Sequence, residues 1–218
     1  MTHFSKILPA TNVVLDIECS SKKRAFEQAG LLFENNNGIA RSTVSENLFA
    51  RERLGSTGLG HGVAVPHGRI KGLKAPLAAF VRLSEAIPFE SPDGEPVKLL
   101  IFLLIPDNVT QQHLEILSEI AEMFSDKAFR ASLIDELDAQ LLHTRLVSWH
   151  PAEREPGEQG HAGAGAVPHP RTGRAGNTGD PPPGPRRGPA RRNVRGRLQA
   201  WRRQYRQSNA RVSSRDIL

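Results

Sequence analysis

One segment, Val97–Ile105, constrains the fold more than any other part of this 218-residue chain. Its side chains are apolar at both odd and even positions, with Lys98 as the exception. A strand with one solvent-exposed face would carry polar residues at every second position. We therefore expect Val97–Ile105 to be a central strand that is covered on both faces.

Hydrophobic periodicity predicts further strands and helices around this segment. Strands are expected over Asn12–Ile17, with Val13, Leu15 and Ile17 on one face, over Val63–Val65 and over Leu77–Leu83. Helices are expected over Lys22–Phe33, from Thr43 to about Arg53, over Thr110–Phe124, and at about 126–134 and 135–146. Strands mixed with helices on a partly parallel sheet predict an α/β fold class.

Capping residues predict where the first two helices begin and end. Ser20 or Ser21 can cap the first helix, and Asn35–Gly38 should stop it, because Asn and Gly tolerate the left-handed conformation. Thr43–Glu46 fits a capping box for the second helix. In that helix Arg51 follows Val44 and Leu48 at helical spacing, so it should border the inward-facing stripe.

A glycine-rich stretch precedes the histidine with the strongest local signal. Gly55–Gly62 holds four glycines in eight residues, which predicts a loop that a ligand can approach closely. Pro66 should end the short strand after it, because proline has no amide to donate. His67 would then lie at a strand end facing the glycine loop.

A histidine that carries a phosphoryl group must be neutral near pH 7, exposed at a rigid edge and surrounded by positive groups. His67 is the candidate acceptor, and the glycine loop could supply backbone amides for an anion. Arg51 could contact a phosphoryl group with two donors. His113 lies in the first turn of its expected helix, where the helix dipole favours an anion.

Ordinary structural roles remain open for each of these residues at this point. His67 could be a surface residue, Arg51 a paired helix residue, and His113 a hydrogen-bonded residue at the edge of the core. His61, His67 and His113 could also converge on a metal ion. No acidic cluster or cysteine completes such a site in the sequence, so we expect no metal and no cofactor.

The stretch Arg51–Gly68, including Ala64-Val-Pro-His-Gly68, resembles the signature of phosphotransferase-system enzyme IIA domains of the fructose/mannitol class. It is most similar to their nitrogen-regulatory branch, and Asn108–Asp126 resembles the same family. The resemblance covers about residues 5–148. It implies a mixed parallel and antiparallel sheet flanked by helices.

The resemblance also implies roles for three residues. His67 would accept the phosphoryl group on Nε2, His113 would support it without accepting it, and Arg51 would stabilise the phosphorylated state. No role is carried over to His61, because relatives often have another residue there. An HPr-type phosphocarrier protein would be the donor, and the phosphorylation state would control target proteins such as kinases or transporters. The alternative is a sugar-specific IIA component that passes phosphate to a IIB domain.

Charge divides the chain near residue 150. Residues 151–218 hold 14 Arg, no Lys and five acidic residues, a net charge of +9, whereas residues 1–150 hold 15 basic and 18 acidic residues, a net charge of −3. We therefore expect a IIA domain over residues 1–149 and a disordered Arg/Pro/Gly-rich tail over 150–218. A frameshift or a read-through extension would also give such a composition.

The Arg-rich tail and the N-terminal residues allow predictions about nucleic-acid binding and the cellular compartment. Arginines mixed with Trp201 and Tyr205 could bind nucleic acid non-specifically, and we expect no other nucleic-acid binding. The longest apolar run, Leu99–Ile105, is too short to span a membrane. The N-terminus lacks the apolar run of a signal peptide, and Cys19 is the single cysteine, so we expect a cytoplasmic protein.

Overall fold

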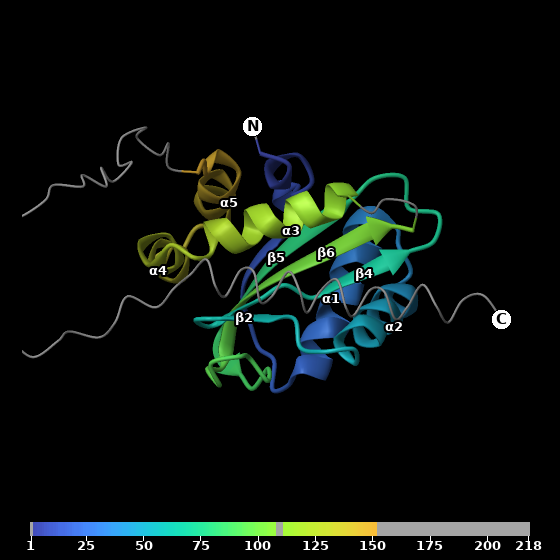
Figure 1. Cartoon of the computed structure of the whole chain (residues 1–218), viewed down its shortest axis with the longest axis horizontal. Coiled ribbons are helices and arrows are strands. Elements are labelled where there is room, and N and C mark those ends of the chain that lie inside the picture. The colour runs from blue at the N-terminus through green and yellow to red at the C-terminus, as the bar shows by residue number, and fades with distance from the viewer. Residues whose placement is uncertain (1, 108–110, 152–218) are drawn as a thin grey trace, which may run out of the picture. The chain divides into compact units, whose positions relative to one another are not determined.

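The computed structural model describes residues 2–107 and 111–151, and the tail expected at 150–218 lies outside them from residue 152 onward. These residues form six strands and five α-helices, with two short 3₁₀ helices, η1 and η2, near the start (Figure 1). The elements in chain order are η1 (Phe4–Lys6), η2 (Ala10–Asn12), β1 (Val13–Ile17), α1 (Lys22–Asn37), α2 (Arg41–Glu52), β2 (Gly58–Gly60), β3 (Val63–Ala64), β4 (His67–Ile70), β5 (Leu77–Ile87), β6 (Val97–Pro106), α3 (Gln111–Met123), α4 (Lys127–Asp135) and α5 (Ala139–Ser148).

The strands form one mixed sheet in the order β1-β5-β6-β3-β2, with β4 also paired to β6. β6 runs antiparallel to β5 and parallel to both β3 and β4. β1 runs parallel to β5, and β2 antiparallel to β3. The predicted α/β class with a mixed sheet and flanking helices is confirmed.

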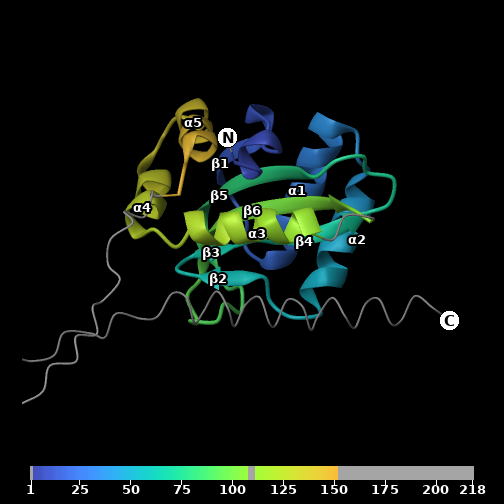
Figure 2. The ribbon, with the colours of Figure 1, turned by 45° about the horizontal axis from the view of Figure 1, so that its top comes forward.

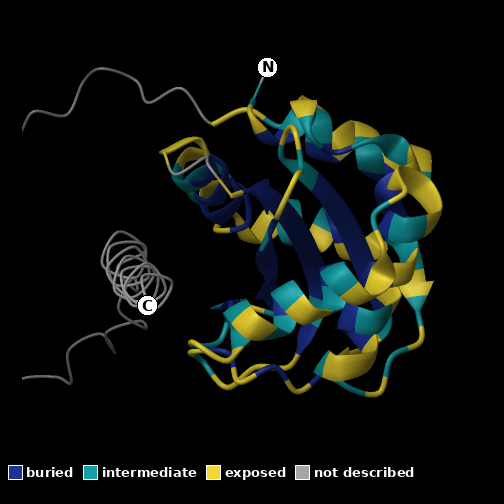
Figure 3. Cartoon of the chain, turned by 90° about the vertical axis from the view of Figure 1, so that its right-hand side faces the viewer, coloured by how far each residue is buried: buried dark blue, intermediate teal, exposed yellow. Residues whose placement is uncertain are grey.

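β6 is covered on both faces, as the apolar run predicts. Alternate residues from Leu99 to Ile105 pack into one core with α3, α4 and α5, and the others pack into a second core with α1 and α2. Figure 2 shows α3 crossing one face of the sheet while α1 lies behind it. The buried strands lie between helices whose outer surfaces are exposed (Figure 3).

The prediction that Val13, Leu15 and Ile17 lie on one face of β1 is wrong for Ile17. Val13 and Leu15 contact the core under α3, whereas Ile17 packs against the core on the opposite face. Asp16 has a φ of 55°, and the pairing of β1 with β5 shifts register between Val14 and Ile17. Asp is one of the few residue types that tolerates this conformation, and the resulting irregularity turns Ile17 over.

Helix α1 begins at Lys22 as predicted, because Ser21 accepts a hydrogen bond from the Arg24 amide. It runs four residues beyond the predicted Phe33 and stops where Gly38, in the predicted stop segment, adopts the left-handed conformation. The predicted capping box of α2 is wrong. The helix begins at Arg41, two residues before Thr43, and its N-cap residue makes no side-chain hydrogen bond. A carboxylate of the preceding helix takes this role, since Glu34 accepts from the Arg41 amide at 3.3 Å.

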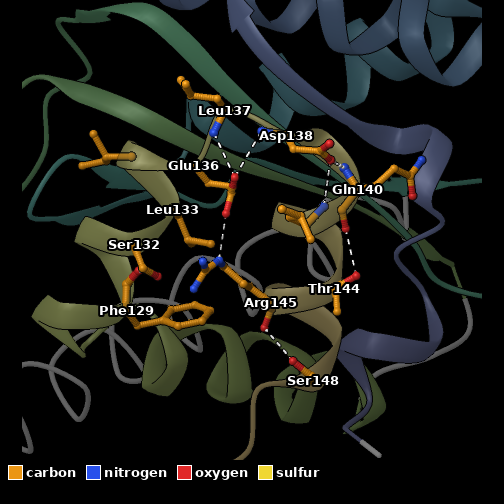
Figure 4. Close-up of polar contacts among 12 residues, drawn as sticks. Phe129, Ser132, Leu133, Glu136, Leu137, Asp138, Gln140, Thr144, Arg145 and Ser148 are labelled. Atoms are coloured by element: carbon orange, nitrogen blue, oxygen red, sulfur yellow. Dashed lines mark hydrogen bonds and ion pairs between the residues drawn. The ribbon is translucent and has the colours of Figure 1, made fainter.

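Helix α5 begins at Ala139, four residues later than expected, because of its local acceptors. Asp138 caps it by accepting hydrogen bonds from the amides of Gln140 and Leu141, at 2.7 and 3.0 Å. Glu136 accepts from the amides of Leu137 and Asp138, and Arg145 binds its other oxygen at 3.1 Å (Figure 4).

No helix within residues 2–107 and 111–151 has both the length and the apolar character needed to cross a membrane.

The buried side chain of Arg82 ties together β5, β1 and the end of α4. Arg82 is 2% exposed, and its guanidinium donates to both carboxylate oxygens of Asp16, at 3.0 and 2.9 Å. It also donates to the carbonyl oxygens of Leu133 and Ile134, at 3.0 and 2.9 Å, and to that of Glu136. These bonds satisfy carbonyl groups that a helix end leaves without partners.

Replacing Arg82 with methionine should lower the free energy of unfolding by about 2–4 kcal/mol, because part-buried carbonyl groups lose their donor. Urea denaturation of the full chain measures this change. Asp16→Asn is the control, and it should cost less than about 1 kcal/mol, because ion pairs with an exposed partner contribute little. An Arg82→Met cost no larger than that of Asp16→Asn would contradict this role.

Candidate functional site

His67 opens strand β4, so the prediction that it follows a strand end is wrong in detail. β3 ends at Ala64, and pairing with the same strand, β6, resumes at His67. Ala64 lies opposite Leu100 and His67 opposite Leu103, so the register is unchanged across the gap. Pro66 interrupts the ladder because it has no amide, but its carbonyl still accepts from the Leu103 amide at 2.9 Å.

The glycine-rich stretch is more ordered than the predicted loop. Gly58–Gly60 forms strand β2, which makes a tight hairpin with β3. Three of its amides already have acceptors: that of Thr57 donates to Glu52, that of Gly58 to Ser56, and that of His61 to Asp93. These contacts do not support the predicted role of this loop's amides as an anion cradle.

Two hydrogen bonds hold the imidazole of His67. Its Nδ1 lies 2.9 Å from the carbonyl oxygen of Val65, and its Nε2 lies 3.0 Å from Nε of Arg51. The carbonyl can only accept and the guanidinium can only donate. These partners assign the tautomer in which Nδ1 carries the hydrogen and Nε2 presents a lone pair.

Burial and charge keep this imidazole neutral. Burial, the largest cause, and the positive charge of Arg51 lower the pKa of His67 from 6.5 to about 3, against the raising effect of the Val65 carbonyl. The predicted need for a neutral histidine near pH 7 is therefore met. The predicted exposure is wrong, because His67 is only 4% exposed and its Nε2 faces Arg51.

The absence of a side chain at Gly68 allows Arg51 to reach His67. A Cβ atom at Gly68 would lie 3.1 Å from backbone and side-chain carbons of Asn47 and 3.2 Å from the Leu48 amide nitrogen. Glycine therefore allows α2 to pack closely on β4. Arg51, in the last turn of α2, then reaches His67, and its Nη1 is anchored on the carbonyl of Gly55 at 3.0 Å.

His113 is buried in the first turn of α3, with 2% of its surface exposed. It lies close enough for its charge to lower the pKa of His67. The structure thus brings the three predicted residues together, Arg51 and His67 by a direct hydrogen bond. Asn108 and Thr110, which precede α3, lie outside the described residues.

Arg69, which the sequence did not single out, is a second cation at this site. It lies two residues after His67 on β4 and therefore on the same face of the strand. Its charge also lowers the pKa of His67, and its guanidinium donates to the Asp107 carbonyl at 3.1 Å. Strand alternation would have predicted this position if β4 had been expected to begin at His67.

The described residues offer no support for the alternative of a metal site. Within residues 2–107 and 111–151, no three His, Cys, Asp or Glu side chains lie close enough to share an ion. His61 is instead placed by Asp93, which accepts from its amide at 2.7 Å and lies 3.9 Å from its ring Nδ1.

Known proteins are similar to this chain in sequence and in fold. Residues 6–147 match the family described as "Phosphoenolpyruvate-dependent sugar phosphotransferase system, EIIA 2". The nitrogen regulatory protein of Pseudomonas aeruginosa is 38% identical over 148 residues, covering 67% of this chain and 96% of that protein. That of Klebsiella oxytoca is 40% identical over 126 residues, covering 55% and 77%. The crystal structure of nitrogen regulatory protein IIA-Ntr from Neisseria meningitidis is 50% identical, covers 65% of this chain and 97% of that chain, and gives a TM-score of 0.62.

The imidazole of His67 should stay neutral and hydrogen-bearing at Nδ1 down to about pH 5, because its pKa lies near 3. Long-range ¹H–¹⁵N NMR spectra measure this directly. In the unfolded chain His67 takes up a proton below about pH 6.5, whereas in the folded chain it does so only near pH 3. The free energy of unfolding should therefore decrease as the pH is lowered from about 6.5 to about 3. The variant His67→Gln should weaken this pH dependence of stability. Titration of the folded His67 imidazole near pH 6.5 would contradict the prediction.

Proposed function

The chain belongs to the phosphoenolpyruvate-dependent sugar phosphotransferase system EIIA 2 family, and from this premise we propose that it is a regulatory phosphoryl carrier of the nitrogen type. The phosphoryl group is accepted on Nε2 of His67. The observation that carries this proposal is the lone pair of a neutral imidazole held at 3.0 Å from an arginine donor. The likeness to nitrogen regulatory proteins supports the regulatory branch.

In the proposed transfer, a phosphohistidine of an HPr-type phosphocarrier protein is the donor. The Nε2 lone pair of His67 attacks phosphorus while the donor's N–P bond breaks. The electron pair of that bond returns to the donor ring, which leaves as a neutral imidazole because its other nitrogen carries a proton. The N–P bond formed is of the same kind as the bond broken, so the transfer is reversible. No proton has to be removed, because Nδ1 keeps its hydrogen on the Val65 carbonyl.

Arg51 has two tasks in this mechanism. Its Nε–H must leave the Nε2 lone pair before phosphorus can approach, and the same guanidinium then neutralises the phosphoryl oxygens. The bond from Nη1 to the Gly55 carbonyl gives the side chain a fixed anchor about which to move. His113 supports the phosphoryl group from the first turn of α3, where the helix dipole favours negative charge.

The proposed output is the change in charge itself. The phosphoryl oxygens bring about −1.5 to −2 charges to a site that now holds Arg51, Arg69 and a neutral imidazole. Such a change can switch the affinity of the surrounding surface for a regulated protein. The targets would be proteins such as kinases or transporters.

We also propose that the carrier domain spans residues 1–149 and that 150–218 are a separate, Arg-rich tail. The family match ends at residue 147, and Trp149 packs against the core under α3. The composition of residues 151–218 supports the division. Nothing in the proposed transfer requires the tail.

Incubation with phosphoenolpyruvate, enzyme I and an HPr-type carrier should label the wild-type chain and leave His67→Ala unlabelled, because the attacking nitrogen is gone. His113→Ala should still accept the group, at an altered rate, because it lacks a supporting residue only. Radiolabelled phosphoenolpyruvate and gel analysis measure both. Full labelling of His67→Ala would overturn the proposal.

The alternative is a sugar-specific IIA component, which the family's own description as a sugar phosphotransferase system favours. It predicts rapid transfer of phosphate from labelled His67 to a fructose- or mannitol-type IIB protein. We expect transfer at least about 100-fold slower than that from a genuine sugar-specific IIA domain, a difference of about 2.7 kcal/mol in activation free energy. Efficient transfer to IIB would replace the regulatory proposal with this one.

A further inference from the structure

The segment Gly55–Thr57 supports both hydrogen-bond partners of His67. The carbonyl of Gly55 anchors the guanidinium of Arg51 at 3.0 Å. The carbonyl of Thr57 accepts from the Val65 amide at 3.0 Å, and the carbonyl of Val65 in turn holds Nδ1 of His67. Displacement of this segment would therefore disturb both nitrogens of the imidazole at once.

One side chain fastens this segment to α2. Glu52, the last residue of the helix, accepts from the hydroxyl of Thr57 at 2.6 Å and from its amide at 3.1 Å. Thr57 is 2% exposed and the Glu52 side chain 7% exposed, so water competes little for these bonds. Hydrogen bonds to a charged carboxylate are the strong ones in such a place.

We propose that Glu52 is a positioning residue for phosphoryl acceptance, holding Gly55–Thr57 so that Arg51 and Val65 keep the lone pair of His67 correctly aimed. The proposal rests on His67 being the acceptor. Glu52 acts through Thr57 and the backbone that carries the partners of the imidazole and the guanidinium.

Lys22 fixes the carboxylate itself. Its ammonium group lies 2.8 Å from Oε1 of Glu52, 3.1 Å from Oε2 of Glu90 and 4.4 Å from the centre of the Phe89 ring. Lys22 begins α1, so the start of one helix orients the carboxylate at the end of the next. Oε1 thus lies beside the Lys22 ammonium while Oε2 accepts from the Thr57 hydroxyl, so the carboxylate is held from two sides.

A second side chain, Ser56, also holds the segment Gly55–Thr57 in place. Glu52 therefore determines the exact position of this segment more than it determines whether the chain folds. The hydroxyl of Ser56 donates to the carbonyl of Phe89 at 2.9 Å and accepts from the Gly58 amide at 3.2 Å. Loss of the Glu52 contacts should therefore leave the segment attached but misplaced. Small misplacements of reacting groups cost large factors in rate.

The first test is Glu52→Gln in the full chain. The amide must turn its NH₂ group toward either Lys22 or Thr57, which are both donors, so one contact is lost. We expect phosphoryl acceptance at saturating donor to slow by about 10- to 100-fold, with little change in the donor concentration for half-maximal rate. The ¹⁵N resonances of His67 in the unphosphorylated protein should shift.

Glu90→Gln is the matched control, because Glu90 binds the same Lys22 through an 85% exposed side chain, whereas Glu52 also binds the buried Thr57. It should leave both the rate and the imidazole spectrum as in the wild type. A Glu90→Gln variant as slow as Glu52→Gln would overturn the proposal, since the effect would then come from charge loss near Lys22.

Thr57 provides a second pair of variants. Thr57→Val removes the hydroxyl at nearly constant shape and should slow acceptance, whereas Thr57→Ser keeps the hydroxyl and should restore it to within about threefold of the wild type. Equal rates for the two variants would overturn the proposal. So would a wild-type rate and an unshifted His67 spectrum in Glu52→Gln.

The two measurements separate this proposal from the one on which it rests. The imidazole spectrum is recorded without any phosphoryl donor, so it reports on Glu52 even if His67 is not the acceptor. Phosphoryl labelling of the His67→Ala variant would contradict the proposed function. An unchanged spectrum in Glu52→Gln would defeat the role of Glu52 alone.

Discussion

Strand β6 is hydrogen-bonded along both edges and buried on both faces, and the position of every functional element follows from it. β5 pairs with one edge, and β3 and β4 pair with the other in one continuous register. That register places His67 opposite Leu103, at the start of β4. α3 packs on one face of β6 and α2 lies on the other side, so residues of both helices can approach the same imidazole.

The chemistry of the site follows from how closely these layers pack. Gly68 lets α2 lie against β4, and Arg51 then reaches Nε2 of His67. Burial at this point removes the water that would stabilise an imidazolium, and the arginine charge opposes it further. The neutral tautomer is thus a consequence of packing, with the Val65 carbonyl selecting which nitrogen keeps the hydrogen.

Local patterns in the sequence predicted features whose causes are local, such as the burial of Val97–Ile105 on both faces. Features that depend on distant partners escaped prediction. The start of α2 relies on Glu34 of another helix, and the burial of His67 depends on the approach that Gly68 permits. The motif identified Arg51 and His67 as candidates, but not their direct hydrogen bond. Glu52 belongs to the same motif, but its contacts were not predicted, since its orientation depends on Lys22, 30 residues away.

A proton and a phosphoryl group would compete for the same lone pair on Nε2 of His67, and the surrounding charge distinguishes them. Arg51 disfavours the proton, which would add a second positive charge beside the guanidinium. The same guanidinium favours a phosphoryl group, which brings negative charge and three acceptor oxygens. In the proposed carrier, the contact that lowers the basicity of His67 is therefore also the contact that stabilises its phosphorylated form. In that proposal, the site stays unprotonated at neutral pH and favours the phosphoryl group over the proton.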